Sequence, residues 1–178
     1  KQIEKNVLED ADGLIKENDL EGAILAYLEY MLITGSQMPP WSAAEQKLLL
    51  GSDKVKTMLA ASQNPSNQET AESAVKALEA IREKQTAGAH ILTIFEANTR
   101  AAMGEPGRAR DLMLDALAEN PYIAGAWKDL GDFYFKNYEP YKAWLCWDTA
   151  RIINPSHPLL DSVNNFENQL INKYPEFF

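Results

Sequence analysis

The sequence has almost no cysteine, no excess of basic residues and no long apolar run. Cys146 is the single cysteine, so neither an internal disulfide nor a thiol cluster for zinc is available. Acidic residues outnumber basic ones by 26 to 17, and the lysines are scattered rather than gathered in a stripe. This argues against nucleic-acid binding, which draws its affinity from Lys and Arg on phosphates. Apolar windows such as residues 20–33 are interrupted by charges and fall short of a membrane span of roughly 20 residues, so no membrane role is predicted.

Recognisable catalytic motifs are also missing. The chain has no Gly-x-Ser-x-Gly, no glycine-rich phosphate loop and no His-Glu-x-x-His. His90 and His157 lie far apart, and neither has a second histidine at helical spacing. The position of His157 at the start of a predicted helix favours a surface or capping residue. We therefore expect no catalytic residue, no metal and no cofactor.

The remaining reactive side chains have ordinary structural explanations. Cys146 lies between Trp144 and Trp147, which favours a small buried hydrophobe over a nucleophile. Glu9 and Asp10 are consecutive and point about 100° apart on a helix, so they cannot share a proton as a catalytic dyad would. Four further acidic residues are predicted to lie on solvated faces: Asp19, Glu21, Glu29 and Glu45.

Helical periodicity dominates the 178 residues, which suit one domain. Nine helices are predicted, at about 1–17, 20–34, 42–62, 67–84, 87–103, 106–119, 122–136, 139–153 and 156–173. Pro39-Pro40 and the Asn-Pro pairs at 64–65, 120–121 and 154–155 mark breaks, because proline pushes the preceding residue out of helical geometry. The predicted fold class is all-α. The chain begins at Lys1 rather than Met, so we expect an upstream segment, and the compartment stays open between cytoplasm and periplasm.

Two of the Asn-Pro pairs are 34 residues apart, and the residues before them repeat at the same period. The series Ala109, Met113, Ala116, Pro121 returns as Ala143, Trp147, Ala150, Pro155. A fixed period of this length is typical of stacked helical hairpins. We therefore predict an α-solenoid built from antiparallel hairpins.

The second copy of this repeat resembles the tetratricopeptide repeat (TPR). The family pattern of Trp, Leu-Gly, Tyr, Ala, aromatic, Ala and Pro is filled by Trp127, Leu130, Gly131, Tyr134, Ala143, Trp147, Ala150 and Pro155. The match is clear for residues 124–157. It is partial for 90–123, where four residues replace the expected Trp, Leu, Gly and Tyr: Thr93, Glu96, Ala97 and Arg100. The resemblance is weaker for 4–36 and absent for 37–84.

The resemblance implies a single TPR-like domain over residues 1–178, with degenerate hairpins in 1–84, TPR-like hairpins in 87–155 and a capping helix at 156–173. In this arrangement small residues such as Gly131 let helices approach, and Trp127, Tyr134 and Trp147 fill the space between them. Ser156 is expected to cap the last helix, with Pro158 in its first turn. Its apolar stripe would be Leu159, Leu160, Val163, Phe166 and Leu170, while Asn164, Asn165, Glu167 and Asn168 would face water.

TPR proteins bind partner peptides in a groove lined by the first helix of each hairpin, and the resemblance implies that function here. The groove positions fall on Lys128, Asp132, Phe135 and Lys136, and in the preceding repeat near Ile94, Asn98 and Ala101. The alternative is that these are ordinary solvated helix residues. TPR proteins that grip chaperone tails have an Asn four residues after the Lys. Asp132 stands at that position here, which disfavours that kind of partner.

The leading hypothesis is thus a non-catalytic scaffold that binds a protein or peptide, with no nucleic acid and no membrane among its partners. A second hypothesis is an accessory domain of a larger enzyme, or a small-molecule site among the aromatics around Trp127 and Trp144. Trp144 and Tyr141 lie toward a flank, where they either pack under the last helix or form an exposed anchor. A third hypothesis is a homodimer through 37–84, with Met38, Trp41 and Leu48 to Leu50 as contacts.

Overall fold

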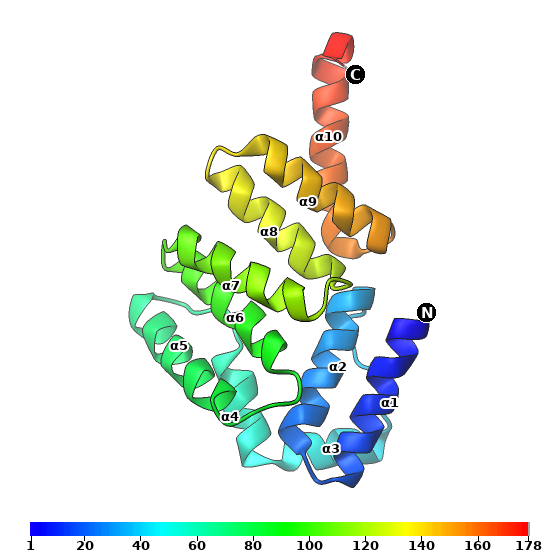
Figure 1. The fold of residues 1–178 in the computed structure, drawn as a ribbon, viewed down its shortest axis with the longest axis vertical. Helices are drawn as coiled ribbons and strands as arrows, with labels where there is room; N and C mark the ends of the chain where they lie inside the picture. Colours follow the sequence, from blue (N-terminus) through cyan, green and yellow to red (C-terminus); the bar gives the residue numbers. More distant parts are fainter. Residues whose placement is uncertain (178) are drawn as a thin grey trace.

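The computed structural model describes residues 1–177, and this part of the chain is all-helical, as predicted (Figure 1). Its helices are α1 (Gln2–Lys16), α2 (Leu20–Thr34), α3 (Ala43–Gly51), α4 (Asp53–Ala61), α5 (Gln68–Arg82), α6 (Ala89–Ala102), α7 (Pro106–Glu119), α8 (Ala124–Lys136), α9 (Pro140–Ile153) and α10 (Asp161–Lys173). Two short 3-10 helices, η1 (Pro158–Leu160) and η2 (Pro175–Phe177), precede and follow α10.

Neighbouring helices pack in pairs, in the manner of a solenoid. The closest pairs are α6 with α7 and α8 with α9, and α7 packs against α8 to join them (Figure 1). On the other side α5 packs against α6, and α4 against α5. The predicted stack of helical hairpins is confirmed at this level.

The first hairpin departs from a simple stack. Helix α2 packs against α1 and also against α3, α4, α6 and α8, whereas a repeat in a regular solenoid touches only its neighbours. Gly88, at φ +72°, makes room for it, because a Cβ there would lie 2.6 Å from Cβ of Leu25. The far end of α2 is held by Asn154, whose Nδ2 donates to the backbone oxygens of Ile33 (3.1 Å) and Thr34 (3.2 Å). The α1–α2 hairpin therefore lies across several later helices and ties them together.

The prediction of a single helix at 42–62 is wrong, since the helix is interrupted at Ser52. This residue is extended (φ −74°, ψ 125°), ends α3 and caps α4, with its Oγ accepting from the Val55 N–H at 3.4 Å. Gly51, a poor helix former, precedes it. Helix α3 starts with a capping box in which the Ser42 N–H donates to Oε2 of Glu45 at 2.5 Å. Glu45 thus caps a helix rather than simply facing solvent.

The predicted last helix, at 156–173, is also divided. His157 caps the short η1, with its Nδ1 accepting from the Leu159 N–H at 3.3 Å, so the expected cap at Ser156 is wrong. Helix α10 follows and buries Val163, whereas Leu159 is 44% exposed. The helix covers α9 only through its first turns, and in Figure 1 its later turns extend beyond the rest of the molecule.

Candidate binding surface

The repeat signature forms the packed interior between α8 and α9. Its buried members are Leu130, Gly131, Ala143, Trp147 and Ala150. A Cβ at Gly131 would lie 2.4 Å from Nε1 of Trp147, so the glycine permits the close approach that the sequence predicted. Trp127 is half-buried and donates from Nε1 to the Pro121 oxygen at 2.8 Å. Tyr134 is half-buried too, under the ammonium of Lys142, and Pro155 follows the end of α9.

The four residues that depart from the TPR pattern in α6 take part in a buried ionic network or lie beside it. Glu96 is fully buried and pairs with Nε of Arg100 at 2.6 Å and Nη1 of Arg82 at 2.5 Å. Arg82 also donates to Thr93 at 3.3 Å. Arg100 reaches two further carboxylates, Glu79 at 3.0 Å and Glu105 at 2.8 Å. Charged side chains therefore occupy the place that the resemblance gives to aromatic and aliphatic ones, and Ala97 supplies the small residue.

The predicted groove residues Lys128 and Asp132 hold each other. Nζ of Lys128 lies 2.7 Å from Oδ2 of Asp132, and the other oxygen, Oδ1, accepts from Nε1 of Trp147 at 3.1 Å. Lys128 also lies 4.0 Å from Asp129. This pair links the surface of α8 to the signature tryptophan beneath it, and neither charge is without a partner.

Asn98 joins this cluster through a residue that the sequence did not single out. Its Nδ2 donates to Oδ2 of Asp129 at 3.2 Å. Burial raises the pKa of Asp129 to about 6, against the opposite effects of Lys128 and Asn98. The expectation that Ile94 faces the groove is wrong, because it is 1% exposed and part of the main core, against which α2 packs. Ala101 is half-buried.

Phe135 and Lys136 border a shallow hollow of about 230 Å³ between α8 and α10, which we call the α8–α10 hollow. Its lining consists of Asp132, Phe135, Lys136, Trp147, Ser162, Val163 and Phe166. Phe135 is 43% exposed, and its ring lies 5.5 Å from that of Trp147 and 5.4 Å from that of Phe166. Lys136 is exposed and has no ion-pair partner among residues 1–177. The hollow thus combines an aromatic floor with one free cation at its rim.

Trp144 is used in packing. It stacks on Phe166 with ring centroids 6.1 Å apart and planes at 10°, and it meets Trp147 edge-on at 5.0 Å. Arg151 lies over the Trp144 ring, with its Cζ 6.0 Å from the ring centroid, and donates to Asn164 (3.1 Å) and Glu167 (2.7 Å). The expectation that both of these α10 residues face water is therefore wrong. Tyr141, the other flank residue, is 76% exposed.

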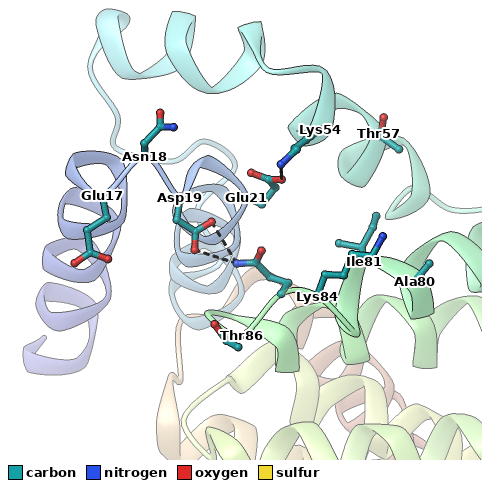
Figure 2. A pocket seen from close by; sticks show the side chains of 11 residues that line it. Glu17, Asn18, Asp19, Glu21, Lys54, Thr57, Ala80, Ile81, Lys84 and Thr86 are labelled. Carbon is teal, nitrogen blue, oxygen red and sulfur yellow. Dashed lines mark hydrogen bonds and ion pairs between the residues drawn. The ribbon is translucent and has the colours of Figure 1, made fainter.

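A larger cavity of about 620 Å³ lies between the α1–α2 turn, α4 and α5 (Figure 2). Three of its charged side chains have partners: Gln85 donates to both oxygens of Asp19, at 3.2 and 3.4 Å, and Lys54 lies 3.4 Å from Glu21. Asp19 also caps α2 by accepting from the Gly22 N–H at 2.9 Å. Asp19 and Glu21 are thus structural partners rather than freely solvated residues.

A second groove, of about 580 Å³, runs between α1, α2, residues 87–90 and residues 119–120, and we call it the acidic groove. Glu29 lies in it with only 9% of its surface exposed. Its Oε1 is 3.0 Å from Nε2 of His90 and accepts a short hydrogen bond from Asn120. The prediction that Glu29 is solvated is wrong, because α2 turns it toward later parts of the chain. No sequence signal marked this residue.

The other reactive side chains have structural places. Cys146 is 5% exposed, and burial raises the pKa of its thiol to about 11. His157 is 3% exposed with Nε2 3.1 Å from the Leu32 oxygen, so it caps as predicted but is not a surface residue. Among residues 1–177, no group of three His, Cys, Asp or Glu is placed to hold a metal ion. Within the same range no helix has the length and apolar character to cross a bilayer.

The region expected to support a dimer is only partly covered. Trp41 packs edge-on against Tyr27 at 5.6 Å, and Leu49 is fully buried. Met38, Leu48 and Leu50 are 60%, 46% and 38% exposed. The dimer hypothesis stays a prediction, with these three side chains as its available contacts.

Comparison with known proteins does not assign the chain to a family. A scan against models of protein families found no match, and a search of curated proteins found no relative. The resemblance to TPR therefore rests on the residues of 124–157 alone.

Proposed function

We propose that this chain is a non-catalytic, TPR-like scaffold that binds a peptide segment of a partner protein at the α8–α10 hollow. The observation that carries the proposal is the combination of an aromatic floor with the unpaired cation of Lys136. Such a surface suits an apolar anchor side chain followed by an acidic residue. Aromatic pockets that take one anchor commonly dominate the affinity of an interface.

The size of the hollow favours a side chain over a whole small molecule. Its volume of about 230 Å³ is below the roughly 300–1,000 Å³ typical of small-molecule pockets. The aromatics of the competing hypothesis are already engaged: Trp127 bonds to Pro121, and Trp144 stacks on Phe166. Peptide binding is therefore the better-supported function, and an accessory role in a larger enzyme has no observation of its own.

The proposal is tested by selecting binders from a displayed library of random peptides against the immobilised wild-type chain. The selected peptides are then measured against a Phe135→Ala, Lys136→Glu double variant. Both side chains are exposed, and neither holds the Lys128–Asp132 pair. We expect the peptides to carry an apolar residue beside an acidic one and to lose at least about ten-fold in affinity, since hot-spot losses reach 2 kcal/mol or more.

A matched control carries Leu145→Ala and Lys142→Glu on α9, which changes the same residue classes at exposed positions outside the hollow. It should retain wild-type affinity. Peptides that bind the double variant as tightly as wild type would refute the hollow as the binding place. So would a selection that yields no binder.

A further inference from the structure

The acidic groove has a one-sided charge. Its lining includes five carboxylates, Glu9, Asp10, Glu17, Glu29 and Glu119, with no lysine or arginine and only His90 as a basic group. The floor between them is apolar or bare backbone, from Val7, Leu14, Ala26, Ala87 and three glycines. Glu9 is the one lining carboxylate that is ion-paired to a lysine, with Lys5 at 3.2 Å on the surface of α1. The lining shares no residue with the α8–α10 hollow.

Glu29 is the most deeply buried carboxylate of the groove, since the other four are exposed. Its side chain is 12% exposed, and both of its hydrogen bonds, from His90 and Asn120, go to Oε1. Oε2 receives no hydrogen bond from residues 1–177 and is not one of the sealed, unsatisfied side-chain atoms of this range, so it is open to the groove that the residue lines. A guanidinium or ammonium group that reaches this oxygen would form a charge-assisted hydrogen bond, which is stronger than the bond made by a neutral donor such as water.

We propose that the acidic groove binds a basic peptide segment, with an arginine or lysine of that segment donating to Oε2 of Glu29. The other carboxylates, Asp10 and Glu17 on α1 and Glu119 at the end of α7, would hold a second cation of the same segment. The apolar floor would contact its aliphatic side chains and the stem of the arginine. This binding place is distinct from the proposed peptide site at α8 and does not depend on it.

The length of the groove sets the length of the segment. Its α1 side is formed by Glu9, Asp10, Gly13, Leu14 and Glu17, one face of a helix. Eight residues of helix rise about 12 Å, at 1.5 Å each, which about four residues of extended peptide would span at ~3.3 Å each. Alternate side chains of an extended segment point the same way, so two cations separated by one residue would face the carboxylates together.

The test is a titration of the isotopically labelled chain with acetylated, amidated Leu-Arg-Ala-Arg, followed by NMR. Three lining residues, Gly13, Gly22 and Gly88, give amide signals in the distinct glycine region and report on the groove directly. Gly104 and Gly107, outside the lining, serve as internal references. We expect saturating shifts at the three groove glycines alone. The same peptide with citrulline in place of both arginines should leave them unmoved, because it is neutral.

Glu29→Gln keeps the shape of the side chain and removes its charge, and should weaken binding by about ten-fold or more. Asp10→Asn, at an exposed position, gives a second variant that does not disturb the fold and should weaken binding about two- to three-fold. The matched control is Glu69→Gln on α5, which removes one exposed charge outside the groove and should change affinity less than two-fold.

Three results would overturn the proposal. One is the absence of saturating shifts at the groove glycines up to about 10 mM peptide, a free energy of binding too small for a specific site. Another is equal binding of the citrulline peptide. The third is an equal loss from Glu69→Gln and Glu29→Gln, which would trace the binding to the overall charge of −9 rather than to the groove. Each leaves the peptide selection at the α8–α10 hollow unaffected, so the two proposals fail separately.

Discussion

Replacing Gly131 by alanine is expected to destabilise the chain, although alanine is the better helix former. Gly131 lies in the middle of α8 where it meets α9, and an added Cβ would lie 2.4 Å from Nε1 and 2.5 Å from Cδ1 of Trp147, and 3.1 Å from the Ala143 oxygen. Real Cβ atoms do not approach other heavy atoms closer than 3.0 Å. The indole must therefore move.

Trp147 has little freedom to move. Its Nε1 donates to Asp132 at 3.1 Å, and its ring contacts Phe135 and Trp144 at 5.5 and 5.0 Å. Overpacking a core costs about 1–3 kcal/mol, and losing a hydrogen bond to a charged group costs about 1.5–3 kcal/mol. The intrinsic helix preference of alanine returns about 1 kcal/mol. The net loss in the free energy of unfolding is thus about 1.5–5 kcal/mol.

The assay is thermal unfolding followed by far-ultraviolet circular dichroism. For a chain of this size about 1 kcal/mol corresponds to roughly 2–4 °C, so Gly131→Ala should lower Tm by about 3–20 °C. Gly13→Ala is the matched control, because Gly13 lies inside α1 with nothing within 4 Å of its missing Cβ. There the helix preference acts alone and should raise Tm by about 2–4 °C.

The two substitutions are chemically identical and differ only in what surrounds them. A Gly131→Ala chain with unchanged or raised Tm would refute the view that the signature glycine is required for the α8–α9 contact. A parallel fall in both variants would point to backbone effects instead of packing. The near-ultraviolet circular dichroism of the tryptophans should change for Gly131→Ala and stay constant for Gly13→Ala.

Three further predictions concern the half-buried Asp129 and the buried Glu96 and Cys146. Burial raises the pKa of Asp129 to about 6, so the folded state binds the proton of this carboxyl more tightly than the unfolded state does. The free energy of unfolding should therefore fall as pH rises from about 4 to 6. Asp129→Asn should remove this pH dependence and add about 1–3 kcal/mol to the free energy of unfolding at pH 7, as measured by urea titration. Glu96→Gln leaves Arg82 and Arg100 without their buried anion and should cost about 2–4 kcal/mol in the same assay, whereas loss of the 42% exposed Glu79 carboxylate should cost under about 1 kcal/mol. Cys146 is buried, and burial raises the pKa of its thiol to about 11, so a thiol reagent should modify it only as fast as urea unfolds the chain. Rapid labelling in native buffer would contradict its buried position.

Local pattern predicted the helices well where strong stop signals flank them. The bounds of α2 and α7 agree with the expected 20–34 and 106–119, since Asp19 with Gly35 and Pro106 with Asn120-Pro121 mark the ends. The break at Ser52 was missed. Gly51-Ser52 is a weak signal for a helix break inside an otherwise periodic run. The hydrogen bond from the Val55 N–H to Ser52 helps to end one helix and start the next, and it is visible only in the structure.

The candidate site residues likewise fall into those that the sequence predicted and those that it did not. Phe135 and Lys136 were predicted from their place in the repeat, and they do border a hollow. Asp129 and Glu29 were not, because their surroundings come from helices distant in the chain: Asn98 for the first, and His90 with Asn120 for the second. Contacts between residues 61 or 91 positions apart leave no trace in local periodicity.

The sequence by itself determined the all-α class, the 34-residue period and the packing of Trp127 to Pro155, because each depends on residues one or two helices apart. Tertiary structure alone decided where the α1–α2 hairpin lies and which of its acidic residues is buried. It also decided how the buried ionic network in α6 takes the place of the aromatic and aliphatic residues of the repeat pattern. The physical reason is that burial of a charge is settled by the sum of partners brought to it from all directions. Glu29 and Glu96 look like surface carboxylates in the sequence, and only their distant partners make them buried ones.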